Sequence, residues 1–195
     1  METSVYVLDT RPLENPEAFA KWYKKVPEYR QKKIDAYSDM KDKALCLGTG
    51  LVLSHAIAAA GFDEIELKIA YEESGKPYFK NDPDFHFSLS HSHERAMCAV
   101  SDEPIGCDVQ VITKDADFDP TEWARLESYA KATDEPLSAL MGRPLPENHV
   151  YTFTDIDFHD EYKYLVCANE AIPDTHIFWC SLDWKAVSED EEAHA

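Results

Sequence analysis

Asp108 and Gln110 are the first residues whose types and spacing could do chemistry. Residues 105–111 alternate between apolar and polar side chains, which is typical of a strand with one buried face. On such a strand Asp108 and Gln110 share a face, and Gly106 leaves room beside them. A carboxylate and an amide oxygen are hard ligands that suit Mg²⁺. An ordinary half-buried strand with its polar face in solvent explains the same pattern. The strand alone therefore does not decide between a Mg²⁺ site and a solvent-exposed polar face.

Glu127 and Lys131 form a second candidate pair. They are four residues apart in a segment that reads as a helix over 121–133, with Asp119 as the N-cap and Pro120 at the first position. Residues at that spacing lie on one helix face. A surface ion pair worth only about 0.3–0.5 kcal/mol explains the spacing equally well.

A third candidate is the stretch of serine and histidine over residues 88–93. Such a turn can end a strand or bind an anion. The histidines of the chain lack HExxH-type spacing, so they do not indicate a histidine metal site.

The composition limits the class of protein. The chain has 195 residues, 44% of them hydrophobic, and a formal net charge of -19. These values are typical of a globular protein and argue against a nucleic-acid or anionic-membrane binder. Residues 21–43 differ from the rest because they hold eight basic and four acidic residues. This excess indicates either a local anion site or a solvated helix face.

The cysteines indicate the compartment. There are five, none in CxxC spacing, and most lie beside apolar residues. An odd number of such cysteines favours free thiols in a reducing compartment. The first residues lack the pattern of a signal peptide, and the longest apolar run is interrupted by polar residues and glycines. A cytoplasmic protein is therefore expected, and its two-halved length predicts a monomer.

The elements that must position these residues alternate in a way that predicts an α+β fold. Two halves are expected, 1–108 and 109–195, joined near residues 108–119. Helices are predicted over 16–25, 28–37, 41–60 and 121–133. Strands are predicted over Ser4–Asp9, 65–71, 85–89, 94–101 and 105–112, with 151–153, Tyr162–Ala168 and 176–181 forming a last antiparallel sheet.

Taken together, these motifs resemble those of the 4'-phosphopantetheinyl transferase superfamily, in the larger form that activates surfactin synthetase. The match lies in the order of the motifs: GKP, then FHFSLSHS, then PIGCDVQ, then the WARLESYAKA helix and a closing YKYLVCA strand. The matching segments are 30–34, 44–51, 75–77, 85–92, 99–101, 104–110, 123–132 and Tyr162–Ala168.

The resemblance implies a pseudo-twofold α+β fold with coenzyme A between the halves. It implies transfer of 4'-phosphopantetheine from coenzyme A to a serine of an acyl or peptidyl carrier protein, with release of 3',5'-ADP. Catalysis would fall to Glu127, as the base, and Lys131, which would stabilise or protonate the departing 3',5'-ADP. The remaining roles would be coenzyme A binding by Lys32, Lys76, Ser90 and His91, and Mg²⁺ binding by Asp108, Glu127 and Gln110.

The chain departs from the family pattern at several positions. Gln110 stands where the family often has a third acid, and Leu126 replaces a lysine. Residues 111–122 form a much shorter connection than the usual insert. These departures keep two alternatives open: a binder of coenzyme A or of carrier protein that no longer transfers, and an interaction protein of this fold without a ligand.

Overall fold

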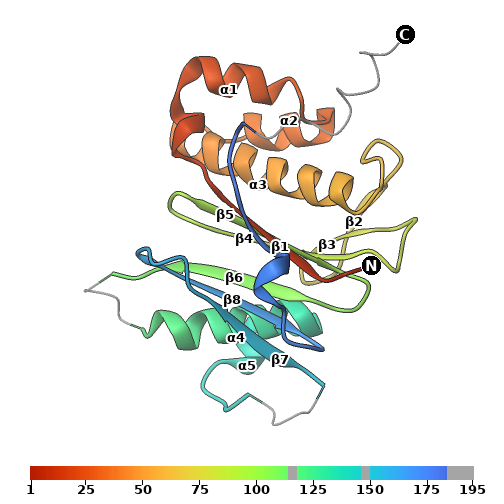
Figure 1. Cartoon of the computed structure of the whole chain (residues 1–195), viewed down its shortest axis with the longest axis vertical. Helices are drawn as coiled ribbons and strands as arrows, with labels where there is room; N and C mark the ends of the chain where they lie inside the picture. The colour runs from red at the N-terminus through yellow and green to blue at the C-terminus, as the bar shows by residue number, and fades with distance from the viewer. Residues whose placement is uncertain (114–117, 146–149, 184–195) are drawn as a thin grey trace.

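The computed structural model describes residues 1–113, 118–145 and 150–183. Two sheets pack face to face, and each is covered on its outer side by helices (Figure 1). Helix α3 (Met40–Ala59) covers the first sheet, and α1 (Pro16–Tyr23) and α2 (Glu28–Asp35) pack on the side of α3 that faces away from the strands. The second sheet is covered by α4 (Pro120–Thr133) and the short α5 (Leu137–Leu140). The expected α+β class is confirmed.

The first sheet has the strand order β4-β5-β1-β9. Strands β1 (Ser4–Asp9), β4 (His86–Ser92) and β5 (Arg95–Ser101) form antiparallel pairs. The bounds of β1 are those predicted, whereas β4 and β5 were predicted over 85–89 and 94–101. A 3-10 turn, η1 (Arg11–Glu14), connects β1 to the helices.

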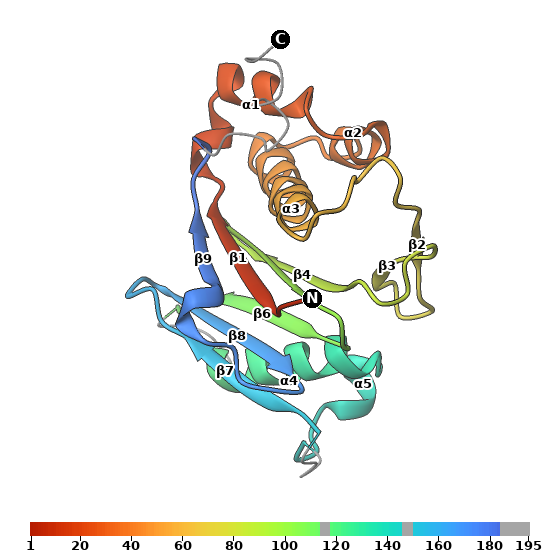
Figure 2. The same ribbon diagram turned by 45° about the vertical axis from the view of Figure 1, so that its right-hand side comes forward.

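The last strand of the chain is in a different sheet from the one predicted. Residues 176–181 were expected to join the last antiparallel sheet. Instead β9 (Ile177–Cys180), after the 3-10 turn η2 (Asp174–His176), lies parallel to β1 at the edge of the first sheet (Figure 2). Alternation along a strand identifies its buried face but not its partner strand, and this partner is about 170 residues away in the chain.

The strand predicted over 65–71 is shorter than expected. Only β2 (Ile69–Tyr71) is extended, and it forms a hairpin with β3 (Pro77–Phe79). Before it, the Asp63 carboxylate accepts a hydrogen bond from the Ile65 backbone N–H at 2.9 Å, and consecutive turns follow. This hydrogen bond from a side chain stabilises a turn in place of the backbone pairing of a strand.

The second sheet has the order β6-β8-β7 and is antiparallel. Its strands are β6 (Gly106–Val111), β7 (Thr152–Ile156) and β8 (Tyr162–Ala168). Helix α4 begins as predicted, since the Asp119 carboxylate accepts a hydrogen bond from the Thr121 N–H at 2.8 Å.

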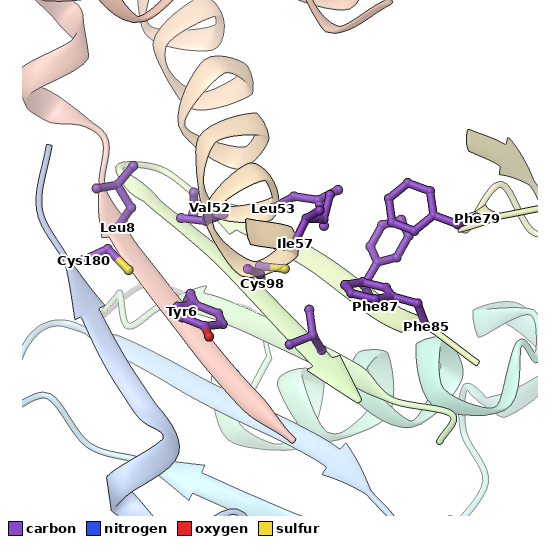
Figure 3. Packing of buried hydrophobic residues seen from close by; sticks show 13 residues of the cluster. Tyr6, Leu8, Val52, Leu53, Ile57, Phe79, Phe85, Phe87, Cys98 and Cys180 are labelled. Carbon is purple, nitrogen blue, oxygen red and sulfur yellow. The ribbon is translucent and has the colours of Figure 1, made fainter. Parts of the chain in front are cut away.

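Separate hydrophobic clusters hold the layers together. Between α3 and the first sheet, Val52, Leu53 and Ile57 pack over Tyr6 and Leu8, beside a group of phenylalanines (Figure 3). A second cluster joins the two sheets, and a third joins α4 to β8. Because these interiors are close-packed, α3 and α4 have fixed positions on their sheets.

The expected boundary at residue 108 lies inside β6, and β9 returns to the first sheet. The division into 1–108 and 109–195 stays a prediction. Within residues 1–113, 118–145 and 150–183, every helix is too short or too polar to cross a bilayer.

Candidate functional site

Strand β6 directs its polar residues toward α4. Cys107 and Val109 are fully buried in the cluster between the sheets. The alternate residues Gly106, Asp108 and Gln110 face the other way, as the period of two predicted. Because α4 lies against this face, Asp108 is only 1% exposed.

Gly106 allows the helix to approach the strand closely. A Cβ built at Gly106 would lie 1.9 Å from the Ser128 carbonyl oxygen and 2.6 Å from the Ala132 backbone nitrogen. Both contacts are with backbone, which cannot turn aside. The missing side chain therefore brings the Glu127–Lys131 turn of α4 within reach of Asp108.

Hydrogen-bond donors surround the Asp108 carboxylate. Its Oδ1 accepts from Lys131 Nζ at 2.7 Å and from Ser90 Oγ at 2.7 Å. Its Oδ2 accepts from Gln110 Nε2 at 3.0 Å. These donors come from α4, β4 and β6 itself, so three elements fix the orientation of one buried carboxylate.

Glu127 and Lys131 complete the cluster. Lys131 Nζ lies 3.3 Å from Glu127 Oε2 and also donates to the Cys107 carbonyl oxygen at 3.1 Å. Burial, followed by the charge of Asp108, raises the pKa of Glu127. Burial disfavours the charged form of Lys131, but Asp108, Cys107 and Glu127 together outweigh it and raise the pKa of the ammonium group. The site thus combines a proton acceptor with a permanent cation.

The cluster opens into a cleft of about 510 Å³, whose lining includes Lys76, Ser88, Glu127 and Lys131. A second pocket of about 160 Å³ lies under α2 and α3. Residues shared by the two linings make them neighbours: Gly75, Pro77 and Leu89.

The second pocket has a basic wall. Arg30, Lys33 and His91 line it, with Tyr29 and Tyr37 supplying aromatic surface. Burial, followed by the charges of Lys131 and Lys33, lowers the pKa of His91. The lowered pKa favours neutral His91, and the Arg30 guanidinium is paired with Glu64, with Nε 2.7 Å from Oε1. Lys33 therefore supplies positive charge for an anionic ligand that carries a flat ring, and the imidazole supplies a hydrogen-bond donor.

Lys76 connects the β2–β3 hairpin to α4. Its Nζ donates to the Ile105 carbonyl oxygen at 3.1 Å and to the carbonyl oxygen of Lys131. Burial lowers the pKa of this lysine. Lys76 therefore lies beside the cluster, in the lining of the cleft, and its ammonium group donates to a carbonyl oxygen in the last turn of α4, where the helix dipole favours a cation.

The structure brings most of the predicted site residues together. Asp108, Gln110, Glu127 and Lys131 form the cluster, with Lys76 in the lining of the same cleft and His91 in the lining of the second pocket. Ser90, expected to contact coenzyme A, is buried and bonds to Asp108.

Lys32 is the predicted residue that lies apart from the others. Its side chain is 73% exposed and pairs with Glu28 on the surface of α2, with Nζ 2.8 Å from Oε1. Its neighbour Lys33 lines the second pocket instead. Lys33 and Arg30 were noticed only as part of the basic segment, because α2 has eight residues and only Tyr29 and Ile34 among them are apolar, too few to show a periodic inner face.

The oxygen groups of the cluster fit Mg²⁺. Asp108 and Glu127 are close enough to raise the pKa of Glu127, and two mutually destabilising carboxylates are stabilised by a cation. Gln110 can offer an amide oxygen beside them. Among the residues described here, no group of three or more His, Cys, Asp or Glu has metal-binding geometry, so a third oxygen ligand would have to come from an amide, water or substrate.

Comparison with known proteins identifies the family of this chain. No family model matches the chain. A 4'-phosphopantetheinyl transferase of Bacillus subtilis is 30% identical over 161 aligned positions, covering 63% of this chain and 72% of the relative.

Two further relatives match over shorter regions. The 4'-phosphopantetheinyl transferase Sfp of Bacillus subtilis (strain 168) is 33% identical over 84 positions, covering 43% of this chain and 38% of the relative. The 4'-phosphopantetheinyl transferase gsp of Aneurinibacillus migulanus is 31% identical over 90 positions, covering 46% of this chain and 37% of the relative. The chain thus spans well under half of these two proteins. Its coverage of the first relative, together with its ordered motifs, shows that the chain belongs to the 4'-phosphopantetheinyl transferase family and is a transferase of the Sfp type.

Proposed function

We propose that the protein transfers the 4'-phosphopantetheine group of coenzyme A to a serine of an acyl or peptidyl carrier protein, in a Mg²⁺-dependent reaction that releases 3',5'-ADP. The observation that carries this proposal is the cluster of Asp108, Glu127 and Lys131 at the wall of a cleft beside a basic pocket. An acid pair with a fixed cation suits phosphoryl chemistry, in which charge collects on oxygen atoms.

In this proposal, coenzyme A lies across the two neighbouring cavities in one orientation. Its phosphoadenosine end would lie in the basic pocket, where Arg30, Lys33 and His91 would face the phosphate groups. The pyrophosphate would then extend past Gly75 and Pro77 into the larger cleft, beside Lys76 and Lys131. In this orientation the phosphorus that is attacked lies next to Glu127.

The residues of the chain then have distinct roles in the transfer. Glu127 accepts the proton of the carrier serine as the serine oxygen forms a bond to the β-phosphorus of coenzyme A. The bond from that phosphorus to the bridging oxygen breaks, and the electron pair leaves with 3',5'-ADP. Lys131, held by Asp108, neutralises the negative charge on the departing phosphate.

Mg²⁺ would be held by Asp108 and Glu127, with Gln110 as a neutral third ligand. When bound, the cation supplies charge neutralisation at the phosphoryl oxygens. The proposal also includes the pseudo-twofold relation of the two halves, the division at residue 108, a cytoplasmic location and a monomeric state.

Mass spectrometry of carrier proteins tests the transfer. The protein would be incubated with Mg²⁺, coenzyme A and a panel of apo carrier proteins. The expected result is a carrier that gains the mass of phosphopantetheine, with loss of that gain in Glu127→Ala. Glu122→Ala is the matched control, since Glu122 lies on the same helix but on its exposed side, away from the cleft.

The alternative is a family member that binds coenzyme A or a carrier without transferring the group. The observation that favours this alternative is the short connection between β6 and α4, residues 112–119. Coenzyme A binding by calorimetry, with no mass gain on any carrier, would favour this alternative. An absence of coenzyme A binding would contradict both.

A further inference from the structure

Alternating serines of β4 connect the two sheets. Ser88 Oγ accepts a hydrogen bond from the Cys107 N–H at 3.0 Å. Ser90 Oγ accepts from the Val109 N–H at 3.2 Å, and Ser92 Oγ accepts from the Val111 N–H at 3.2 Å. Strand β6 pairs through its backbone with β8 on the opposite edge, so these hydroxyl groups satisfy donors that would otherwise lack a strand partner.

Ser90 differs from the other two serines in the group to which its hydroxyl donates a hydrogen bond. A hydroxyl group can donate one hydrogen bond and accept two. Among the hydrogen bonds of the described residues, Ser90 alone of the three also donates to a carboxylate, Asp108 Oδ1, at 2.7 Å. Because the Val109 N–H occupies its acceptor side, the hydroxyl proton is directed at Asp108.

Asp108 depends on such donors because it is almost completely buried. An ionised carboxylate in the interior needs hydrogen bonds to remain charged and to keep one orientation. Lys131 and Gln110 supply two from the ends of long side chains, whereas Ser90 has a short side chain on a paired strand and also accepts a hydrogen bond from the β6 backbone.

We propose that Ser90 is a positioning residue, which holds the Asp108 carboxylate in the orientation needed to bind a divalent cation beside Glu127. This inference rests on the proposed function, because it assigns Asp108 to the cation. It gives Ser90 a role different from the contact with coenzyme A that the family resemblance implies. Ser88 and Ser92 join the sheets without this role.

Cation binding tests the proposal without relying on turnover. The probe is Mn²⁺, titrated by electron paramagnetic resonance into the full-length protein in the presence of saturating coenzyme A. Ser90→Ala is expected to raise the Kd for Mn²⁺ by about 10- to 100-fold, as loss of a residue that orients a ligand does. The Kd for coenzyme A without metal, measured by calorimetry, is expected to stay unchanged.

Ser92→Ala is the matched control, since it also removes one hydroxyl acceptor from a β6 N–H. Its Kd for Mn²⁺ is expected to equal that of the wild type. Ser90→Thr keeps the hydroxyl group and is expected to restore Mn²⁺ binding, which provides a test if Ser90→Ala does not fold.

Several results would overturn the positioning role. Equal loss of Mn²⁺ binding in Ser90→Ala and Ser92→Ala would show that only the connection between sheets matters. Loss of coenzyme A affinity with unchanged Mn²⁺ binding would place Ser90 on the ligand instead. Wild-type protein that binds no Mn²⁺ would also contradict the proposal. Normal Mn²⁺ binding without transfer to any carrier would remove the proposed function alone.

Discussion

Gly106 and the carbonyl oxygen of Ser128 leave no room for a side chain between β6 and α4, since a Cβ at Gly106 would lie 1.9 Å from that oxygen. Gly106→Ala must therefore move the helix, at a cost of about 1–3 kcal/mol in the free energy of unfolding. Transfer is expected to fall further than stability, because Glu127 and Lys131 move away from Asp108. Urea unfolding and the transfer assay measure the two effects, and normal activity in this variant would show that the close approach is unimportant.

Glu127→Gln keeps the shape of the side chain but removes its ability to accept a proton. The transfer rate is expected to fall by roughly 10²–10⁴-fold, the usual contribution of a general base. Binding of coenzyme A, measured by calorimetry without metal, should persist, because Glu127 is absent from the lining of the basic pocket that would bind the phosphoadenosine end. Unchanged turnover would exclude Glu127 as the base.

The pH dependence of transfer follows from the raised pKa of Glu127. A base must be unprotonated, so the rate should fall as the pH falls through this raised pKa. The same group should make stability fall as the pH rises from its unfolded pKa to its folded pKa, because the folded protein binds that proton more tightly. Rate and urea-unfolding profiles of wild type and Glu127→Gln provide the check, and identical profiles would contradict the assignment.

Gln110→Glu adds a third carboxylate beside Asp108. In the wild type, Gln110 Nε2 donates a hydrogen bond to Asp108 Oδ2 at 3.0 Å. The glutamate of the variant loses this hydrogen bond and repels Asp108, so without metal the melting temperature should be lower. With Mg²⁺ it should act as a charged ligand and tighten cation binding. Thermal melts and metal titrations report both effects. Binding of Mg²⁺ no tighter than in the wild type would remove Gln110 from the set of metal ligands.

Lys33 and Lys32 form a matched pair for coenzyme A binding. Lys33 lines the basic pocket, whereas Lys32 pairs with Glu28 on the surface. Lys33→Ala is expected to raise the Kd for coenzyme A several-fold, and Lys32→Ala should have a smaller effect because a salt-screened surface lysine contributes little. Calorimetry of both variants decides between the two lysines, and a larger loss in Lys32→Ala would support the role that the family resemblance implies.

Local rules predicted the elements that position the site. The alternation of β6 identified the face of Asp108, and the capping residue Asp119 located the start of α4. Spacing along α4 then placed Glu127 and Lys131 together. These relationships lie within single elements, where a repeat of 2 or 3.6 residues determines the geometry.

Relationships between distant elements were not accessible in the same way. The bond between Ser90 and Asp108 depends on which edges of two sheets meet, and the parallel pairing of β9 with β1 depends on the path of the whole chain. The binding of Lys76 to the carbonyl oxygens of Ile105 and Lys131 belongs to the same class. Such contacts leave no periodic pattern in the sequence.

The position of β9 has a consequence for synthesis of the protein on the ribosome. Strand β1 is made before every other described strand, but its parallel neighbour ends at Cys180. The first sheet therefore has an open edge until nearly the whole described chain has emerged, although its other strands and covering helices are already available. Emergence of β9 from the ribosome, rather than emergence of residues 1–108, sets the earliest time at which this edge of the first sheet can close.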